Sequence, residues 1–191
     1  MAATTHLCED NGAATGSPAH GTTRHGFGGN TDYALNCNWK TADNSGASET
    51  AASAAQIGKP DCSYEKWQYV KFTGTFSRIS NAKWTPHHNV FTDFCGAGIF
   101  LMGAVLSAYT TPSRTANANL TTDFTKGVYA YQGLPVGFST TGPEDASPTT
   151  ELTAAGYTQY LVSQTQVPTS VATSFSGQTN GMTWILTYDE E

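Results

Sequence analysis

The chain has 191 residues, a length that suits one domain with a buried core and excludes two full catalytic domains. It contains 9 Lys and Arg against 15 Asp and Glu, which gives a formal net charge of −6, and only 13% of its residues are charged. An average globular protein has roughly 25% charged residues. The acidic balance argues against a basic nucleic-acid-binding protein.

Small polar and aromatic residues replace the missing charged residues. The sequence contains 30 Thr, 15 Ser and 19 Gly, and 12% of its residues are aromatic. Thr and aromatic side chains fit the pleated surface of a sheet, whereas Glu, Lys, Leu and Arg, which favour solvated helices, are scarce. The composition therefore predicts an all-β fold.

Neither a membrane span nor a secretory signal is recognisable. The longest apolar stretch runs from Ile99 to Leu106 and falls far short of the roughly 20 residues that a bilayer requires. The first ten residues lack the basic and apolar regions of a signal peptide. We expect a protein made in the cytoplasm, with a mature secreted form as the alternative.

The first third of the chain is poor in the large apolar residues that build a core. Of the 22 aromatic residues, only Phe27, Tyr33 and Trp39 lie in residues 1–60. Gly, Pro and Asn residues punctuate the stretch 10–30, which indicates irregular backbone. We predict that residues 1–60 form an extended arm or long loops that lie over another part of the protein.

One segment of this predicted arm has the pattern of a short helix. Residues 45–60 contain Ser residues that can cap a helix, an Ala-rich centre, and Gly58 and Pro60 as a stop. The pattern predicts a helix near residues 46–57. A flexible Ala/Ser linker is the alternative, and neither interpretation assigns chemistry to the segment.

Residues 61–191 hold nearly all the aromatic residues, in short runs separated by turn signals. This alternation is typical of β-sandwiches and barrels and predicts the core domain. The expected strands lie at residues 66–73, 75–84, 91–94, 99–109, 127–131, 157–167 and 182–188. The run 99–109 is almost continuously apolar, which predicts a central strand buried on both faces or, alternatively, a short buried helix.

The clearest strand signal is at the C-terminal end. In residues 182–188 every even position is a large apolar residue, while Thr183, Ile185 and Thr187 occupy the odd positions. Such alternation predicts a strand with its even residues, Trp184 among them, facing the core. The polar stretch 139–148 contains two prolines and is expected to be an exposed loop.

The four cysteines do not form a recognisable redox or zinc motif. They are Cys8, Cys37, Cys62 and Cys95. No C-x-x-C pair occurs, so zinc-ribbon and thioredoxin-like sites lose support. Two disulfides would allow three pairings, and without a secretory signal we favour reduced thiols. Cys95 follows Phe94 and lies close after His87 and His88, but a small buried hydrophobic residue is the preferred interpretation over a nucleophile.

Other candidates for catalysis or metal binding are weak. Adjacent His87 and His88 on a strand would point to opposite faces, so only a turn would let both bind one ion. The remaining histidines are His6, His20 and His25, and the carboxylates considered as pairs are Asp61, Glu65, Asp93, Asp123, Glu144, Asp145 and Glu151. Neither a G-x-S-x-G motif nor a phosphate-binding glycine loop occurs. We predict a non-enzymatic protein without catalytic, cofactor-binding or metal-ligating residues.

Tryptophans keep a sugar-binding function open. Trp39, Trp67, Trp84 and Trp184 are enough for the aromatic platform on which a carbohydrate-binding sandwich holds its ligand. A small sandwich also needs large aromatic residues in its core, and the alternation around Trp184 favours that role. A lectin-like module therefore remains the competing interpretation.

Three segments carry a resemblance to a protein class. Residues 157–173 (YTQYLVSQTQVPTSVAT), 182–191 (MTWILTYDEE) and 69–84 (YVKFTGTFSRISNAKW) resemble parts of small β-sandwich virion proteins of tailed bacteriophages. This resemblance implies a capsid decoration (cement) protein, a neck or tail accessory protein, or a fibre base. It implies no catalytic residues.

These observations lead to one hypothesis. We expect an all-β sandwich of jelly-roll type at residues 61–191 with an N-terminal arm at residues 1–60. The protein would be a structural virion component of a tailed phage, made in the host cytoplasm, that decorates the outer capsid. Its partners would be the major capsid protein or other virion subunits and further copies of itself, a trimer being favoured. Nucleic acid, membrane and cofactors are not expected.

Overall fold

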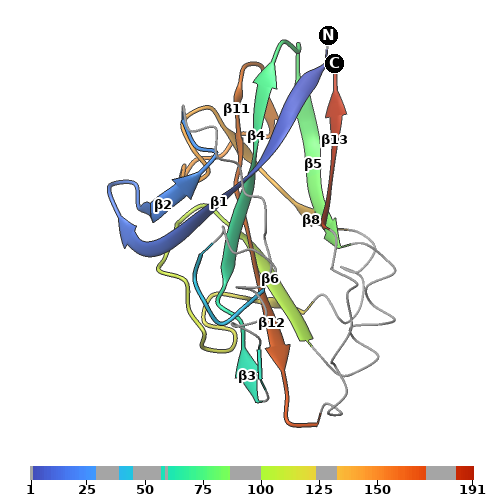
Figure 1. Cartoon of the computed structure of the whole chain (residues 1–191). Helices are drawn as coiled ribbons and strands as arrows, with labels where there is room; N and C mark the ends of the chain where they lie inside the picture. The colour runs from blue at the N-terminus through green and yellow to red at the C-terminus, as the bar shows by residue number, and fades with distance from the viewer. Residues whose placement is uncertain are drawn as a thin grey trace.

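The computed structural model describes residues 2–28, 39–44, 57–58, 60–86, 100–123, 133–170 and 184–191. Within these ranges every regular element is a β-strand, and the strands form two antiparallel sheets (Figure 1). The prediction of an all-β fold from the Thr-rich and aromatic composition is therefore confirmed. The described ranges contain no helix that could span a membrane.

The larger sheet has nine strands in the described part of the chain. Its main strand order is β2–β1–β4–β12–β6–β7, while β3 pairs with β12, and β11 pairs with both β4 and β9. The strands are β1 (Ala3–Thr15), β2 (His20–His25), β3 (Asp61–Cys62), β4 (Lys66–Gly74), β6 (Phe100–Leu106), β7 (Thr122–Asp123), β9 (Phe138–Ser139), β11 (Gly156–Thr158) and β12 (Tyr160–Val167).

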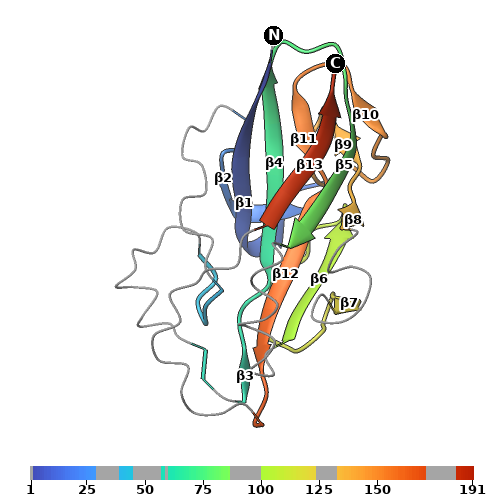
Figure 2. The ribbon, with the colours of Figure 1, turned by 90° about the vertical axis from the view of Figure 1, so that its right-hand side faces the viewer.

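The smaller sheet has four strands in the same ranges. Its order is β10–β5–β13, with β8 also paired to β5. The strands are β5 (Ile79–Pro86), β8 (Leu134–Pro135), β10 (Glu151–Leu152) and β13 (Trp184–Glu190). Strand β13 ends beside the start of β1, so the two ends of the chain lie together at one end of the protein (Figures 1 and 2). The backbone amide of Ala3 donates a hydrogen bond to Glu190 Oε1 at 2.7 Å there.

Both sheets contribute to one apolar cluster. Phe72 and Leu161 of the larger sheet pack with Ile79 and Trp84 of the smaller sheet and with Phe138 of β9. All five side chains are nearly or fully inaccessible to solvent. Burial of each such side chain contributes roughly 1.5–3 kcal/mol. The cluster therefore stabilises the packing of the two sheets against each other.

A second cluster covers the opposite face of the larger sheet. Trp67, Tyr69 and Tyr160 project from β4 and β12 and pack against Tyr109 and Leu120, which lie in the connection between β6 and β7. The rings meet edge-on or tilted, with centroids 4.9 Å apart for Trp67 and Tyr109 and 5.5 Å apart for Tyr69 and Tyr160. The central strands of the larger sheet are therefore buried on both faces.

The predicted arm is wrong for residues 3–25. Strand β1 pairs with β4 over eight consecutive residues, from Ala3 opposite Gly74 to Asp10 opposite Trp67, and β2 continues the sheet on its other side. The predicted arm contains few large apolar residues because β1 places acidic and amide side chains at buried positions, and these are satisfied by partners distant in sequence. The segment 39–44 lies against the larger sheet, through contacts of Trp39 with β12 and of Asn44 with β4.

Most predicted strands of the core domain are present. Strands β4, β5, β6, β12 and β13 overlap the expected runs, with ends that differ by a few residues. Within the run 99–109, residues 100–106 form β6, a strand flanked by β12 and β7 instead of a helix. The expected alternation in β13 is confirmed, since Leu186 and Tyr188 pack on the core while Ile185 is 39% exposed. The predicted strands 91–94 and 127–131 and the predicted helix 46–57 lie outside the described residues.

The loop 139–148 departs from the expectation of full exposure. Its centre, Gly142 to Glu144, is buried, whereas Thr140, Thr141 and the stretch after Asp145 are exposed. The burial of Glu144 follows from an ion pair with Arg24 of β2, a residue 120 positions away in the sequence.

Candidate functional site

The densest group of ionisable side chains lies inside the larger sheet, around three consecutive residues of β1. Glu9, Asp10 and Asn11 are 0%, 0% and 3% exposed. Successive side chains of a strand point to opposite faces, so Glu9 and Asn11 enter one face and Asp10 enters the other. This arrangement gives two polar clusters, one on each side of the sheet.

Asp10 is held by donors from three other strands. Arg24 lies directly opposite it on β2, and the Arg24 Nε is 3.1 Å from Asp10 Oδ2. The Tyr160 hydroxyl of β12 donates to Oδ2 at 2.6 Å, and the Tyr69 hydroxyl of β4 donates to Oδ1 at 3.2 Å. The backbone amide of Gly21 approaches Oδ2 at 3.4 Å. One carboxylate thus ties β1 to β2, β4 and β12.

Arg24 links this cluster to the loop 139–148. Its two terminal nitrogens donate to the two oxygens of Glu144 at 3.1 and 2.8 Å, a bidentate pair. Its guanidinium also lies over the ring of Phe27, 3.4 Å from the centroid. The guanidinium therefore bridges two buried carboxylates and fixes the loop to β2.

Glu9 forms the second cluster, on the opposite face. Lys66 Nζ of β4 lies 3.0 Å from Glu9 Oε1, and neither side chain is exposed. The amides of Asn11 and Gln68 also donate to the Glu9 carboxylate, at 2.8 and 3.1 Å. Lys66 donates a further hydrogen bond to the carbonyl of Asn44 at 2.9 Å. On this face of the larger sheet, the side chains around Glu9 are therefore polar, whereas those around Phe72 are apolar.

The segment 39–44 covers the polar cluster around Glu9. Its Asp43 accepts hydrogen bonds from the Asn11 side chain and from the Gly12 backbone amide, at 3.1 and 2.7 Å. Its Trp39 Nε1 donates to Ser163 Oγ of β12 at 3.2 Å. These contacts at both ends of the segment explain why it follows the sheet closely.

The buried positions shift several pKa values. Burial raises the pKa of the Asp10 carboxyl, an effect that the Arg24 charge and the Tyr160 hydrogen bond oppose. Burial also raises the pKa of the Tyr69 and Tyr160 hydroxyls, and the adjacent Asp10 charge adds to that shift. Both tyrosines therefore stay protonated donors toward Asp10 at any ordinary pH.

The chemistry of these clusters is structural. Glu9 and Asp10 accept hydrogen bonds from cations, amides or hydroxyls within the fold, and the remaining buried carboxylate nearby, Glu65, accepts from the Ser113 amide and the Asn119 side chain. A general base needs a lone pair that faces a substrate. The oxygens of Glu9, Asp10 and Glu65 instead accept hydrogen bonds from protein donors, and all three side chains are buried.

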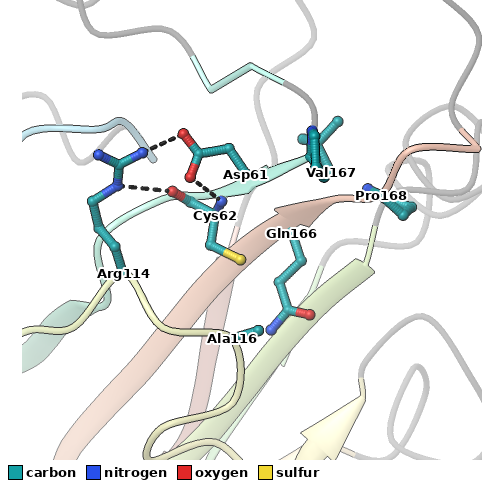
Figure 3. Close-up of a pocket in the computed structure, with 8 residues that line it drawn as sticks. Asp61, Cys62, Arg114, Ala116, Gln166, Val167 and Pro168 are labelled. Carbon is teal, nitrogen blue, oxygen red and sulfur yellow. Dashed lines mark hydrogen bonds and ion pairs between the residues drawn. The ribbon is translucent and has the colours of Figure 1, made fainter.

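Two surface hollows lie away from the buried clusters. The first has a volume of about 390 Å³ and is lined by Asp61 and Cys62 of β3, Gln166 of β12 and Arg114 (Figure 3). Arg114 forms an ion pair with Asp61 and donates to the Cys62 carbonyl at 3.4 Å. The positive charge of Arg114 is therefore already paired with a carboxylate of the protein.

The Cys62 thiol faces this first hollow on the side of Gln166 (Figure 3). Partial burial raises its pKa, and the neighbouring Asp61 charge raises it further. A nucleophilic cysteine needs the opposite shift, because the thiolate is the reactive form. The geometry does not support a reactive cysteine at this position.

The second hollow has a volume of about 430 Å³ and lies where the smaller sheet meets the segment before β12. Lys83 of β5, Pro135 of β8, Gly137, Gln159 and the stretch 148–150 line it. Its walls combine two proline rings with one ammonium, two side-chain amides and two threonine side chains. Unlike Arg114 in the first hollow, Lys83 has no acidic partner among the residues that the structure describes.

Some of the residues considered for sugar binding or metal binding are buried, and others lie outside the described residues. Trp67 and Trp84 are 0% and 3% exposed, so the core role is confirmed for them and neither can belong to an exposed sugar platform. The described ranges contain no group of three or more His, Cys, Asp or Glu side chains placed to hold a metal ion. Among the other candidates, His87, His88, Asp93, Cys95 and Cys37 lie outside the described residues, as does the side chain of Trp184, whereas His6, His20, His25, Trp39 and Asp123 lie within them.

The candidate carboxylates are dispersed. Asp61 pairs with Arg114 and Glu144 pairs with Arg24, while Glu151 lies 3.8 Å from Arg78 at the surface. Hydrogen bonds from the Ser147 amide and the Ser139 hydroxyl lower the pKa of Asp145, which closes the turn of its own loop. None of these arrangements places two carboxylates around a common opening.

Sequence reasoning missed the residues that build the buried clusters. Glu9, Asp10 and Arg24 lie in the stretch interpreted as an arm, and their partners Tyr69 and Tyr160 were noted only as strand residues. The turn signal Gly16-Ser17-Pro18 between two Thr- and His-containing runs was the available indication of the β1–β2 hairpin.

Comparisons with known proteins supply no relative from which a function could be inferred, so the function is argued from the geometry of the chain. The free thiols of Cys8 and Cys62, the closed ionic clusters and the two hollows are the features from which a function can be argued. No protein-family model matches the chain, and neither a curated protein nor a solved structure is significantly similar to it.

Proposed function

We propose that this protein is a non-enzymatic structural component of a tailed-phage particle, which decorates and stabilises the outer capsid surface. The observation that carries the non-enzymatic part is the closure of the ionic clusters. Glu9 and Asp10 are fully buried and are bound by Lys66, Arg24 and two tyrosine hydroxyls. Buried charges of this kind fix strand positions and register and leave no oxygen for a substrate.

The particle and its outer surface are argued from the sequence. The segments 69–84, 157–173 and 182–191 resemble small virion proteins, and in the structure they form most of β4, β5, β12 and β13. The net charge of −6 disfavours contact with packaged nucleic acid and so favours an external position. Partners would be the major capsid protein or other virion subunits. A homo-oligomer, most simply a trimer, would match a capsid symmetry axis.

The proposal also covers how the two sheets pack and how their strands are connected. The shared cluster of Phe72, Leu161, Ile79 and Trp84 supports a β-sandwich in which the two sheets face each other. We propose the jelly-roll connectivity for this sandwich. An experimental structure of the full chain would test it, because residues 87–99, 124–132 and 171–183 lie outside the described residues.

Binding to particles is the direct test of the function. Purified chain is mixed with capsids that lack it, and the bound fraction is measured by sedimentation against increasing protein. We expect saturation at a fixed ratio to the major capsid protein, and no binding to particles that already carry the full complement. Binding without saturation, or the absence of binding, would contradict the proposal.

A glycan array distinguishes the structural proposal from the competing interpretation, a sugar-binding module. A sugar-binding module would give a specific glycan signal together with a monomer in size-exclusion chromatography with light scattering. The structural proposal predicts a blank array and a symmetric oligomer or particle-bound species. The burial of Trp67 and Trp84 supports the blank array, because neither ring can stack on a sugar.

A further inference from the structure

The hollow beside Lys83 has the properties of a docking site. It has a volume of about 430 Å³ and is lined by β5, β8, the stretch 148–150 and Gln159. Its base is tightly built: a Cβ added at Gly137 would lie 2.8 Å from Gln159 Oε1 and 2.8 Å from Pro148 Cβ. Glycine is therefore required at this point, and the backbone there is fixed by its neighbours.

Among the Lys and Arg residues that the structure describes, Lys83 is the one without an interaction within the protein. The structure describes seven Lys and Arg residues, and each of the other six has an interaction within the protein: Arg24, Lys40, Lys66, Lys71, Arg78 and Arg114. Lys83 is exposed at the rim of the hollow and has no ion pair or hydrogen bond to a protein group. In a chain with a net charge of −6, an unpaired ammonium beside a concave surface favours an anionic ligand.

Gln159 offers a second donor in the same hollow. Its Oε1 accepts a hydrogen bond from the Gly137 amide at 2.8 Å, which fixes the identity of the two amide atoms. Its Nε2 has no acceptor within the protein and is left to donate. A carboxylate, with two oxygens that accept hydrogen bonds, matches a donor pair of ammonium and amide.

An apolar residue lies on the same surface. Lys83 is opposite Thr187 and Thr85 is opposite Ile185 in the β5–β13 pair, so Lys83 and Ile185 project from one face of the smaller sheet as diagonal neighbours. Diagonal neighbours lie roughly 7–8 Å apart. Ile185 is the exposed large hydrophobic residue of the described part of the chain.

We propose that this surface binds an extended acidic segment of a partner protein. The partner's carboxylate would lie on Lys83 and Gln159 Nε2, and an apolar side chain two residues away would pack on Ile185. Residues i and i+2 of an extended chain are on one side and about 7 Å apart, which fits that spacing. The lining contains two prolines and no aromatic ring, which favours a peptide over a stacked sugar. This inference rests on the proposed function for its partner, a virion subunit.

The test uses the blocked peptide acetyl-Ala-Glu-Ala-Leu-Ala-amide, with the Gln-for-Glu peptide as its match, titrated into ¹⁵N-labelled full-length protein. We expect chemical-shift changes at the Gln159 side-chain amide and at the backbone amides of Val136 and Gly137. The Gln peptide and the Lys83→Gln variant should each weaken binding roughly two- to fivefold. The control variant Lys71→Gln, on the other sheet, should bind as the parent does. Equal binding by both peptides, or by Lys83→Gln, would overturn the inference.

Capsid sedimentation with the same variants separates the two proposals. Loss of capsid binding in Lys83→Gln but not in Lys71→Gln supports both the site and the function. Undiminished capsid binding by Lys83→Gln overturns the site and leaves the function standing. Peptide binding without capsid binding by any variant overturns the function and supports the site.

Discussion

Replacing Lys66 with Met should strongly destabilise the protein, because it leaves the Glu9 carboxylate buried without its cation. The two charges are 3.0 Å apart and neither side chain is exposed. At an effective dielectric constant of about 20, their attraction is worth roughly 5–6 kcal/mol, which desolvation of the pair largely offsets. Removal of one partner keeps the desolvation cost and loses the attraction, so the expected loss of stability is about 3–5 kcal/mol.

Urea unfolding followed by circular dichroism measures this loss in the free energy of unfolding, and thermal unfolding measures the corresponding change in Tm. For a domain of this length, a loss of 3–5 kcal/mol corresponds to a decrease in Tm of roughly 6–20 °C. The double variant Glu9→Gln, Lys66→Met removes both charges, and the single amide oxygen of Gln can keep one of the two hydrogen bonds that Asn11 and Gln68 donate to Glu9. We expect it to be more stable than Lys66→Met alone.

A surface ion pair provides the matched control. Arg78 is 43% exposed and pairs with Glu151 and Glu191 at the protein surface. Arg78→Met should leave the unfolding midpoint close to that of the parent, since exposed pairs contribute little. If Lys66→Met were as mild as Arg78→Met, or if the Glu9 and Lys66 substitutions were simply additive, the ionic-cluster account would be refuted.

Three further substitutions, with Tyr188→Phe as a control for the first, test the structure around β1. Tyr160→Phe removes the 2.6 Å hydrogen bond to Asp10 and should cost about 1–3 kcal/mol in urea unfolding. Tyr188→Phe should be nearly neutral, because the Tyr188 hydroxyl makes no hydrogen bond within the described part of the chain. Burial raises the pKa of the Cys8 thiol from 9.0 to about 12, so the unfolded state loses its proton first and stability should fall above pH 9. This alkaline slope should be shallower in Cys8→Ala, and an unchanged slope would contradict the assignment. Gly12 has φ +83° and an added Cβ would meet a Thr side chain at 2.2 Å, so Gly12→Ala should lower Tm, with at least about 1 kcal/mol lost.

The strands that the sequence revealed are those with one-sided burial or a dense aromatic run. Strand β13 alternates because one face packs on the core and the other is exposed at Ile185. Strand β4 is recognisable from its aromatic and β-branched residues, although both of its faces are buried. In each case local residue types are enough to indicate a strand.

Strand β1 was hidden because its buried positions are polar. Asp10 has the appearance of a loop residue until Arg24 and Tyr160 are known to lie beside it, and Tyr160 is 150 positions away in the sequence. Local patterning cannot predict such a partner, since the cost of burying the carboxylate is offset only by long-range contacts. The burial of Glu144 in a loop expected to be exposed has the same origin.

The buried clusters also decide between the two uses of tryptophan that the sequence left open. Trp67 and Trp84 occupy the two apolar clusters, one on each face of the larger sheet, where a small β protein needs large side chains. The sequence alone could not choose between a platform and a core, because β4 is buried on both faces and its alternation does not identify an outer side.

The most direct test of the central claim is quantitative mass spectrometry of purified particles of the tailed phage in which we propose that this chain is a structural component. A structural decoration protein predicts the chain in intact particles at a fixed, symmetry-related ratio to the major capsid protein. Its absence from such particles, while it is abundant in infected-cell lysate, would contradict the account.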